Sequence, residues 1–163
     1  MAARFRSRQA AALYTSDLCR AIQTAEPIEQ ALGMEAVPVR ELREIALGAW
    51  EGRTREELIA EFPELWSAWV KDPDWDIVPG GEGAEPFERR VRVALAGLLD
   101  THPGGDVVVV THGGVIQTAL AGVVGRRTRG VFPFVIQNAS LTGLQRFGGR
   151  TVVTSVNDTC HLA

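Results

Sequence analysis

The segment Asp106–Gly114, D-V-V-V-V-T-H-G-G, places one histidine directly after four valines and a threonine. A run of valines predicts a strand buried on both faces, as in a parallel sheet covered by helices. His112 would then lie at the carboxyl end of a central strand, where ligands bind in open α/β sheets. Gly113 and Gly114 would let a ligand approach backbone N–H groups at a helix start. The segment alone fits a ligand site and an ordinary turn equally well.

Two further segments carry groups that could act on an anion. Arg20 lies in Y-T-S-D-L-C-R-A, a strand end followed by a helix start, where a guanidinium can hold a phosphate or carboxylate with two hydrogen bonds. Glu44 lies in L-R-E-I-A-L-G-A-W-E-G, which its glycines and weak periodicity predict to be a loop across a pocket. Flanked by apolar residues, Glu44 is a candidate general acid. The alternatives are a surface arginine at position 20 and a salt bridge from Glu44 to Arg43.

Several classes of function lack their signatures. The histidines at positions 102, 112 and 161 have no carboxylate or thiolate partners at ligand spacing, so no metal site is predicted. The sequence has no Walker loop, no G-x-G-x-x-G and no serine-hydrolase elbow. A net charge of −3 gives no general basic field for nucleic acid or membrane. An anionic ligand would therefore need a local cationic site.

The composition is that of one globular domain. With 163 residues, 45% of them hydrophobic, the chain can bury a core and shows no linker that would divide residues 1–163. Cys19 and Cys160 are too few for a disulfide framework, which fits a reducing compartment. No apolar run has transmembrane length and the N-terminus lacks a signal-peptide core. The chain is expected to be cytoplasmic.

Helices and strands are predicted to alternate, which favours an α/β fold in three layers, a mainly parallel sheet with helices on both faces. The predicted helices are Ala2–Ala11, Asp17–Leu32 with Ser16 as its N-cap, a segment from the Thr54 capping box to Glu61, Pro63–Val70, a long helix around Phe87–Leu99, and Val115–Val124. The predicted strands are Ala12–Thr15, Ala36–Val39, Asp106–Val110, and a terminal hairpin of Ser140–Phe147 and Thr151–Val156.

Taken in order, these segments resemble the histidine phosphatase superfamily, which has the phosphoglycerate mutase-like fold. The resemblance rests on S-D-L-C-R-A with the following Q-T-A-E, on L-R-E-I-A-L-G-A-W-E-G, on P-G-G-E and on V-V-V-V-T-H-G-G. It extends to Q-N-A-S and to the ending N-D-T-C-H-L, and so covers nearly the whole chain. Each motif is weak alone, and their shared order carries the resemblance.

The resemblance implies a phosphomonoesterase that hydrolyses a small phosphorylated metabolite through a phosphohistidine intermediate, with no metal or cofactor. Arg20 would clamp the phosphate, and Glu44 would protonate the leaving oxygen. His112 would be the second pocket histidine, bonding to the phosphoryl group beside Gly113. The expected partners are the substrate or inorganic phosphate, and family members differ in oligomeric state, so a homo-oligomer stays open.

One family motif is missing. The family's nucleophile lies in an R-H-G motif after the first strand, and this sequence has no R-H-G and no histidine before His102. The expectation is an N-terminally truncated domain that lacks the strand beside the one carrying His112, and that is inactive as given. The alternatives are phosphoryl transfer of the phosphoglycerate mutase type and a non-catalytic pseudoenzyme that binds an anionic ligand or a protein partner.

Overall fold

The computed structural model describes residues 1–130 and 133–162. The helices and strands of that part of the chain are β1 (Ala12–Ser16), α1 (Cys19–Leu32), β2 (Val37–Val39), α2 (Arg55–Glu61), α3 (Pro63–Lys71), α4 (Ala84–Thr101), β3 (Val107–Val110), α5 (Gly113–Val123), β4 (Leu141–Phe147) and β5 (Arg150–Asp158). Short 3₁₀ helices cover Ala2–Arg4, Arg40–Leu42, Gly48–Trp50, Trp75–Ile77 and Cys160–Leu162.

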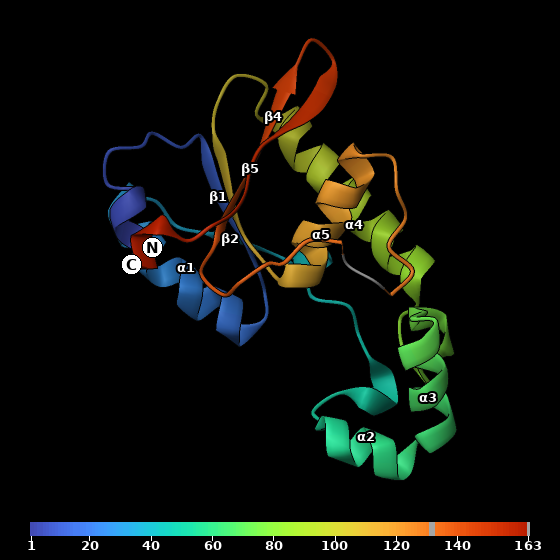
Figure 1. Ribbon diagram of the computed structural model, residues 1–163. Helices are drawn as coiled ribbons and strands as arrows, with labels where there is room; N and C mark the ends of the chain where they lie inside the picture. Colours follow the sequence, from blue (N-terminus) through green and yellow to red (C-terminus); the bar gives the residue numbers. More distant parts are fainter. Residues whose placement is uncertain (131–132, 163) are drawn as a thin grey trace.

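The parallel sheet has the strand order β2-β1-β3, with α1 on one side and α4 and α5 on the other (Figure 1). Leu13 of β1 and Val110 of β3 pack with the inner face of α1, whose buried residues include Ile28. On the opposite face, Phe87 of α4 and Val115 of α5 pack with the segment that follows β2. The expected α/β fold with helices on both faces is confirmed.

Strand β3 differs from its prediction. It begins at Val107, and only Val110 is buried, while the three valines before it are half-buried. Among the described residues β3 pairs with β1 alone, so it lies at the edge of the parallel sheet. Strands β4 and β5 form a separate antiparallel hairpin, as predicted, that does not join this sheet. The prediction of a central strand buried on both faces is therefore wrong for the chain as described.

Two N-terminal boundaries also differ. The predicted helix Ala2–Ala11 is a 3₁₀ turn over Ala2–Arg4 followed by irregular backbone. Phe5 is the one large apolar side chain between charged neighbours there, so no apolar stripe supports a longer helix. Helix α1 begins at Cys19, and its N-cap is Leu18. The hydroxyl of Ser16 instead accepts a hydrogen bond from the Leu18 amide, which forms a turn before the helix.

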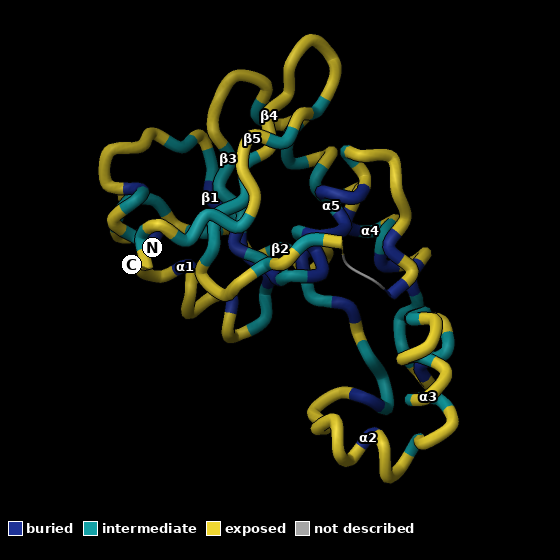
Figure 2. Tube along the Cα trace, in the orientation of Figure 1, coloured by how far each residue is buried: buried dark blue, intermediate teal, exposed yellow. Residues whose placement is uncertain are grey.

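Helices α2 and α3 form an arm that projects from the body (Figure 1). Thr54 and Glu57 form the predicted capping box at the start of α2. The arm is exposed over most of its surface (Figure 2), and its core is built around Trp50 and Leu58. The rings of Trp50, Trp66 and Trp69 are mutually in contact, and Trp75 lies against Trp69. The tryptophans therefore hold the arm together.

Candidate functional site

The carboxyl ends of β1 and β3 bring a serine and a histidine together. Because the strands are parallel, with Thr15 opposite Val110, the residues that follow them emerge at the same edge. There the Nε2 atom of His112 lies 2.9 Å from the Oγ atom of Ser16. Both residues are buried. His112 is also the N-cap residue of α5, which fixes it at a strand-to-helix junction.

The environment of His112 disfavours its charged form. Burial, together with the positive charges of Arg20 and Arg90, lowers the pKa of His112 from 6.5 to about 4. The imidazole is therefore neutral at pH 7, and one of its ring nitrogens is a donor while the other is an acceptor. A neutral imidazole can donate a hydrogen bond to an anion, and the two nearby guanidinium charges favour an anion at this place.

Arg20 is the second residue of α1 and its side chain is exposed. Among the described residues, its guanidinium has no hydrogen-bond or ion-pair partner within contact distance. Its charge nevertheless acts on His112. Arg20 thus follows β1 at the edge of the sheet where His112 follows β3, with its side chain exposed to solvent.

Glu44 reaches the same edge from the loop after β2. Its Oε2 atom accepts a hydrogen bond from the Gly114 amide at 2.9 Å, and its Oε1 atom accepts one from the Ile45 amide at 3.0 Å. A Cβ atom at position 114 would lie 2.2 Å from Glu44 Oε1, so glycine is needed for this approach. At Gly113 a Cβ atom would meet nothing within 4 Å, which leaves the neighbouring backbone open.

Further contacts hold the segment that carries Glu44. Arg43 donates two hydrogen bonds to Asp17, at 2.6 and 2.7 Å, which ties the segment to the β1–α1 turn and lowers the pKa of the Asp17 carboxyl. Thr111 donates a hydrogen bond to the Leu42 carbonyl at 2.8 Å. The alternative salt bridge between Arg43 and Glu44 does not form, since Arg43 pairs with Asp17.

Sequence reasoning missed two residues of this site. Ser16 was expected to be a helix cap, and its contact with His112 depends on strand register. Arg90, on α4, contacts the backbone of the Glu44 segment and acts on His112. The one available signal for Arg90 was its position one turn after Phe87, on the apolar face of a clear helix.

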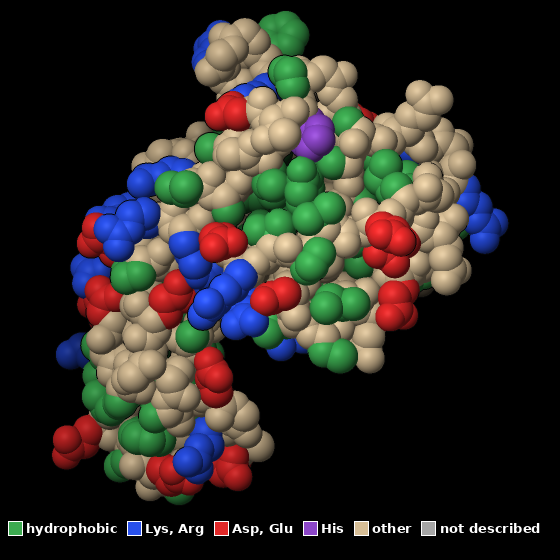
Figure 3. Space-filling view, turned by 180° about the vertical axis from the view of Figure 1, so that it is seen from behind, with side chains coloured by type: hydrophobic (Ala, Val, Ile, Leu, Met, Phe, Trp, Pro, Cys, Tyr) green, Lys and Arg blue, Asp and Glu red, His purple; other side chains and the backbone are tan. Residues whose placement is uncertain are grey.

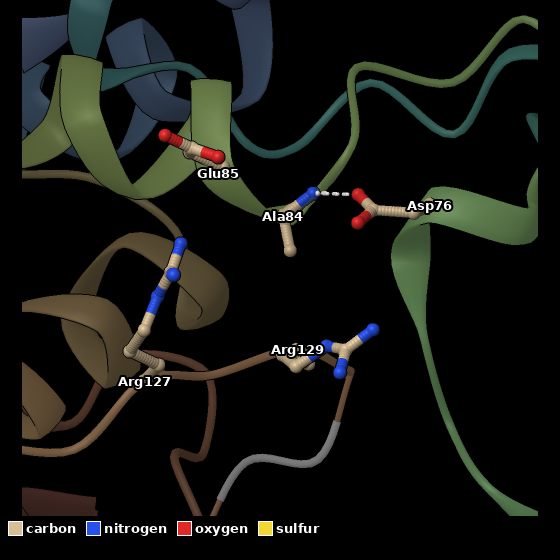
Figure 4. Close-up of a pocket in the computed structure, with 5 residues that line it drawn as sticks. All are labelled: Asp76, Ala84, Glu85, Arg127 and Arg129. Carbon is tan, nitrogen blue, oxygen red and sulfur yellow. Dashed lines mark hydrogen bonds between the residues drawn. The ribbon is translucent and has the colours of Figure 1, made fainter.

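Two cavities lie away from Arg20, Glu44 and His112. One of about 180 Å³ lies beside the start of α4 and is lined by Asp76, Ala84, Glu85, Arg127 and Arg129 (Figure 4). The two arginines are paired, Arg127 with Glu88 and Arg129 with Asp74. A groove of about 890 Å³ runs between α4, α5 and the hairpin.

Figure 3 shows hydrophobic side chains gathered at the middle of the body on the face turned away in Figure 1. Within the described ranges, no group of three or more His, Cys, Asp or Glu side chains could hold a metal ion. No helix within the same ranges has the length and apolar character needed to span a membrane.

Comparison with known proteins gives consistent matches over this architecture. A family model described as histidine phosphatase superfamily (branch 1) matches residues 1–159. Phosphoserine phosphatase 1 of Hydrogenobacter thermophilus is 30% identical over 150 residues, which cover 92% of this chain and 71% of that protein. The solved structure of YhfR from Bacillus stearothermophilus is similar with a TM-score of 0.86 at 28% identity, covering 99% of this chain and 81% of that one. The mycobacterial glucosyl-3-phosphoglycerate phosphatase in complex with inorganic phosphate gives a TM-score of 0.81 at 30% identity, covering 96% and 82% of the two chains.

Proposed function

Because this chain belongs to the histidine phosphatase superfamily, we propose that its domain is a metal-independent phosphomonoesterase acting on a small phosphorylated metabolite. The phosphoryl group binds at the carboxyl ends of β1 and β3, against Arg20, Gly113 and His112. The observation that carries this proposal is the Arg20 guanidinium, which has no hydrogen-bond or ion-pair partner among the described residues, near a neutral, buried His112. Phosphoryl transfer depends on positioning the phosphoryl oxygens and neutralising their charge, and a guanidinium and an imidazole supply suitable donors.

In this mechanism an imidazole nitrogen bonds to phosphorus while the ester P–O bond breaks, and Glu44 gives its proton to the leaving oxygen. Water then attacks phosphorus and gives its proton to the Glu44 carboxylate, while the P–N bond breaks and inorganic phosphate is released. His112 is the assisting histidine in this proposal and not the attacking one. Its Nε2 atom is already hydrogen-bonded to Ser16, and the residue is only 8% exposed.

We place the attacking histidine outside these 163 residues, on a strand that pairs with the free edge of β3. Two observations support this. Strand β3 has a pairing partner on one side only among the described residues, and its first three valines are half-buried. An unpaired ladder and uncovered valines are both costly, and one added strand would remove both costs. On this proposal the 163-residue chain binds phosphate but does not hydrolyse a phosphate ester.

The first experiment measures binding of inorganic phosphate to the 163-residue chain by titration calorimetry. Binding is expected, and Arg20→Ala should weaken it at least about ten-fold through loss of a charge-assisted contact. Arg55→Ala is the matched control, since Arg55 is the first residue of α2, and it should leave binding unchanged. Equal binding by the chain and the Arg20→Ala variant would show that the phosphate site is placed wrongly.

The second experiment measures hydrolysis of an aryl phosphate and of phosphoserine by the same chain and by a version extended at its N-terminus. Turnover is expected only in the extended version. Turnover by the 163-residue chain that is abolished by His112→Ala would overturn the assignment of His112 as the assisting group. Phosphate binding without turnover in the extended version would instead favour the pseudoenzyme.

A further inference from the structure

The Arg90 guanidinium uses all of its hydrogen-bond donors. Its Nε and Nη2 atoms donate to the two carboxylate oxygens of Glu82, at 2.5 and 2.7 Å. Its Nη1 atom donates to the carbonyls of Glu41 and Arg43, each at 2.8 Å, and Nη2 donates to the Glu44 carbonyl at 3.1 Å. An arginine carries five N–H donors in a fixed planar arrangement, and five acceptors surround this one.

The acceptors define one short segment. Three of them are backbone carbonyls of residues 41, 43 and 44, so the guanidinium fixes the path of the chain through Glu44 itself. Glu82 adds a contact on the other side of Glu44, because its Oε2 atom also accepts a hydrogen bond from the Ala46 amide at 3.3 Å. Arg90 and Glu82 together therefore hold the chain on both sides of Glu44.

Arg90 is itself held in place. It lies on α4 with its guanidinium carbon 4.8 Å from the centroid of the Phe87 ring, and Phe87 is 1% exposed. The side chains of Arg90 and Glu82 are only 22% and 18% exposed, so their ion pair is shielded from solvent. A shielded pair with its donors satisfied is a rigid anchor, whereas removing one partner leaves a charge without compensation.

We infer that Arg90, supported by Glu82, is a positioning residue that sets where the Glu44 carboxylate meets the Gly114 amide and thus its place relative to His112. This position of the Glu44 carboxylate matters for catalysis only if Glu44 has the role given to it in the proposed function. The geometric claim can be tested without that role. Among the described residues, no hydrogen bond or ion pair joins Arg90 to the Glu44 side chain, so the effect passes through the backbone carbonyls.

A lysine cannot replace this arginine. Its ammonium group has three donors around one nitrogen and cannot reach a carboxylate and three separate carbonyls together. Arg90→Lys keeps the positive charge while it removes the planar donor set, so it separates geometry from charge. Arg92→Lys is the matched control, because Arg92 is exposed on the same helix and no hydrogen bond from its side chain is found among the described residues.

The test measures amide hydrogen exchange and chemical shifts of Ile45 and Gly114 by NMR in the 163-residue chain. In Arg90→Lys both amides should exchange about ten-fold faster or more, and both should shift, because the Glu44 carboxylate no longer sits on them. In Arg92→Lys neither should change. Glu82→Gln provides a second route should Arg90→Lys fail to fold, and the same two amides should respond.

Unchanged Ile45 and Gly114 amides in folded Arg90→Lys and Glu82→Gln would overturn the inference. A general loss of stability would speed exchange throughout α1 and β1 as well, so a selective response at Ile45 and Gly114 separates positioning from a merely structural role. Phosphate binding at Arg20 is a separate measurement. If that binding is absent while the two amides respond, the proposed function fails and the positioning role stands.

Discussion

The Glu44 carboxylate lies against the backbone of Gly114, with Oε2 2.9 Å from the amide nitrogen and Oε1 2.2 Å from where a Cβ atom would stand. This contact joins the loop after β2 to the first turn of α5, two residues beyond His112. A side chain at position 114 and the observed carboxylate position are mutually exclusive.

Gly114→Ala should therefore displace Glu44 without unfolding the protein. The clashing atoms belong to the end of a flexible side chain, and alanine favours a helix over glycine by roughly 0.5–1 kcal/mol. The expected result is an unfolding free energy that is unchanged or slightly higher, together with faster exchange of the Ile45 amide. Gly113→Ala is the control, since its Cβ atom would meet nothing within 4 Å. Strong destabilisation by Gly114→Ala would mean that Glu44 cannot move aside.

The stability of the protein should fall between about pH 6.5 and pH 4 because of His112. Burial first, and then the charges of Arg20 and Arg90, lower its pKa to about 4, whereas in the unfolded chain the pKa is near 6.5. The unfolded chain thus binds a proton in this window that the folded chain rejects, which costs on the order of 3 kcal/mol by pH 4.

Urea unfolding of the chain and of His112→Gln from pH 8 to pH 4 measures this contribution. The carboxylates that titrate near pH 4 are present in both proteins. The difference between their two curves of unfolding free energy against pH therefore isolates the contribution of His112. The difference should change steadily below pH 6.5. Parallel curves over the whole range would contradict the lowered pKa.

Asp17→Asn should weaken the anchor between the β1–α1 turn and the Glu44 segment. The pair with Arg43 is partly exposed, at 27% for Asp17 and 41% for Arg43, so a loss of about 0.2–1 kcal/mol is expected. Arg43 lowers the Asp17 pKa below its ordinary value of 3.8, so the contribution is present above that pH and is lost as the pH falls further.

Thermal unfolding at pH 7 and pH 3 checks the Asp17 prediction, with Asp100→Asn as the control. Asp100 also pairs with an arginine, Arg146, but that pair is 65% and 48% exposed and lies away from the site. The effect of Asp17→Asn should be larger at pH 7 than at pH 3. An equal effect at both values would show that the pair does not titrate as described.

Trp50→Ala should loosen the arm selectively. Trp50 is 5% exposed and its ring contacts those of Trp66 and Trp69, so its removal should cost about 3–5 kcal/mol within the arm. Hydrogen exchange should rise in α2 and α3 while the amides of β1 and α1 stay protected. Ile59→Ala, at an exposed position of α2, should leave both regions unchanged. Equal loss of protection in β1 would show that the arm and the body unfold as one unit.

The sequence was sufficient to predict that the segments carrying Arg20 and His112 emerge at one edge of a parallel sheet. A buried strand ending in T-H-G-G and a strand-to-helix turn before Arg20 must meet, since parallel strands share a carboxyl edge. The capping box at Thr54 and the terminal hairpin were predictable for similar local reasons. The capping box and the hairpin are determined by residue types within a few positions of one another, whereas the shared edge follows from the parallel pairing of β1 and β3.

Arg90 was not predictable, because it binds backbone carbonyls and these leave no pattern of side chains to recognise. The partial exposure of the β3 valines was missed for a different reason. A run of four valines favours a buried strand. Whether a neighbouring strand covers them depends on residues outside this segment. The prediction of an N-terminal helix was wrong because Phe5 is the one side chain of that segment that packs into the core with α1.

The hold of Arg90 on main-chain oxygens has a consequence for engineering this domain. The side chains of Glu41 and Ala46 are exposed and take no part in these contacts, because the Glu41 carbonyl accepts from Arg90 and the Ala46 amide donates to Glu82. Replacing these two side chains should leave the backbone contacts, and with them the position of the Glu44 carboxylate, unchanged. The exposed side chains at positions 41 and 46 and the position of the Glu44 carboxylate can therefore be altered independently.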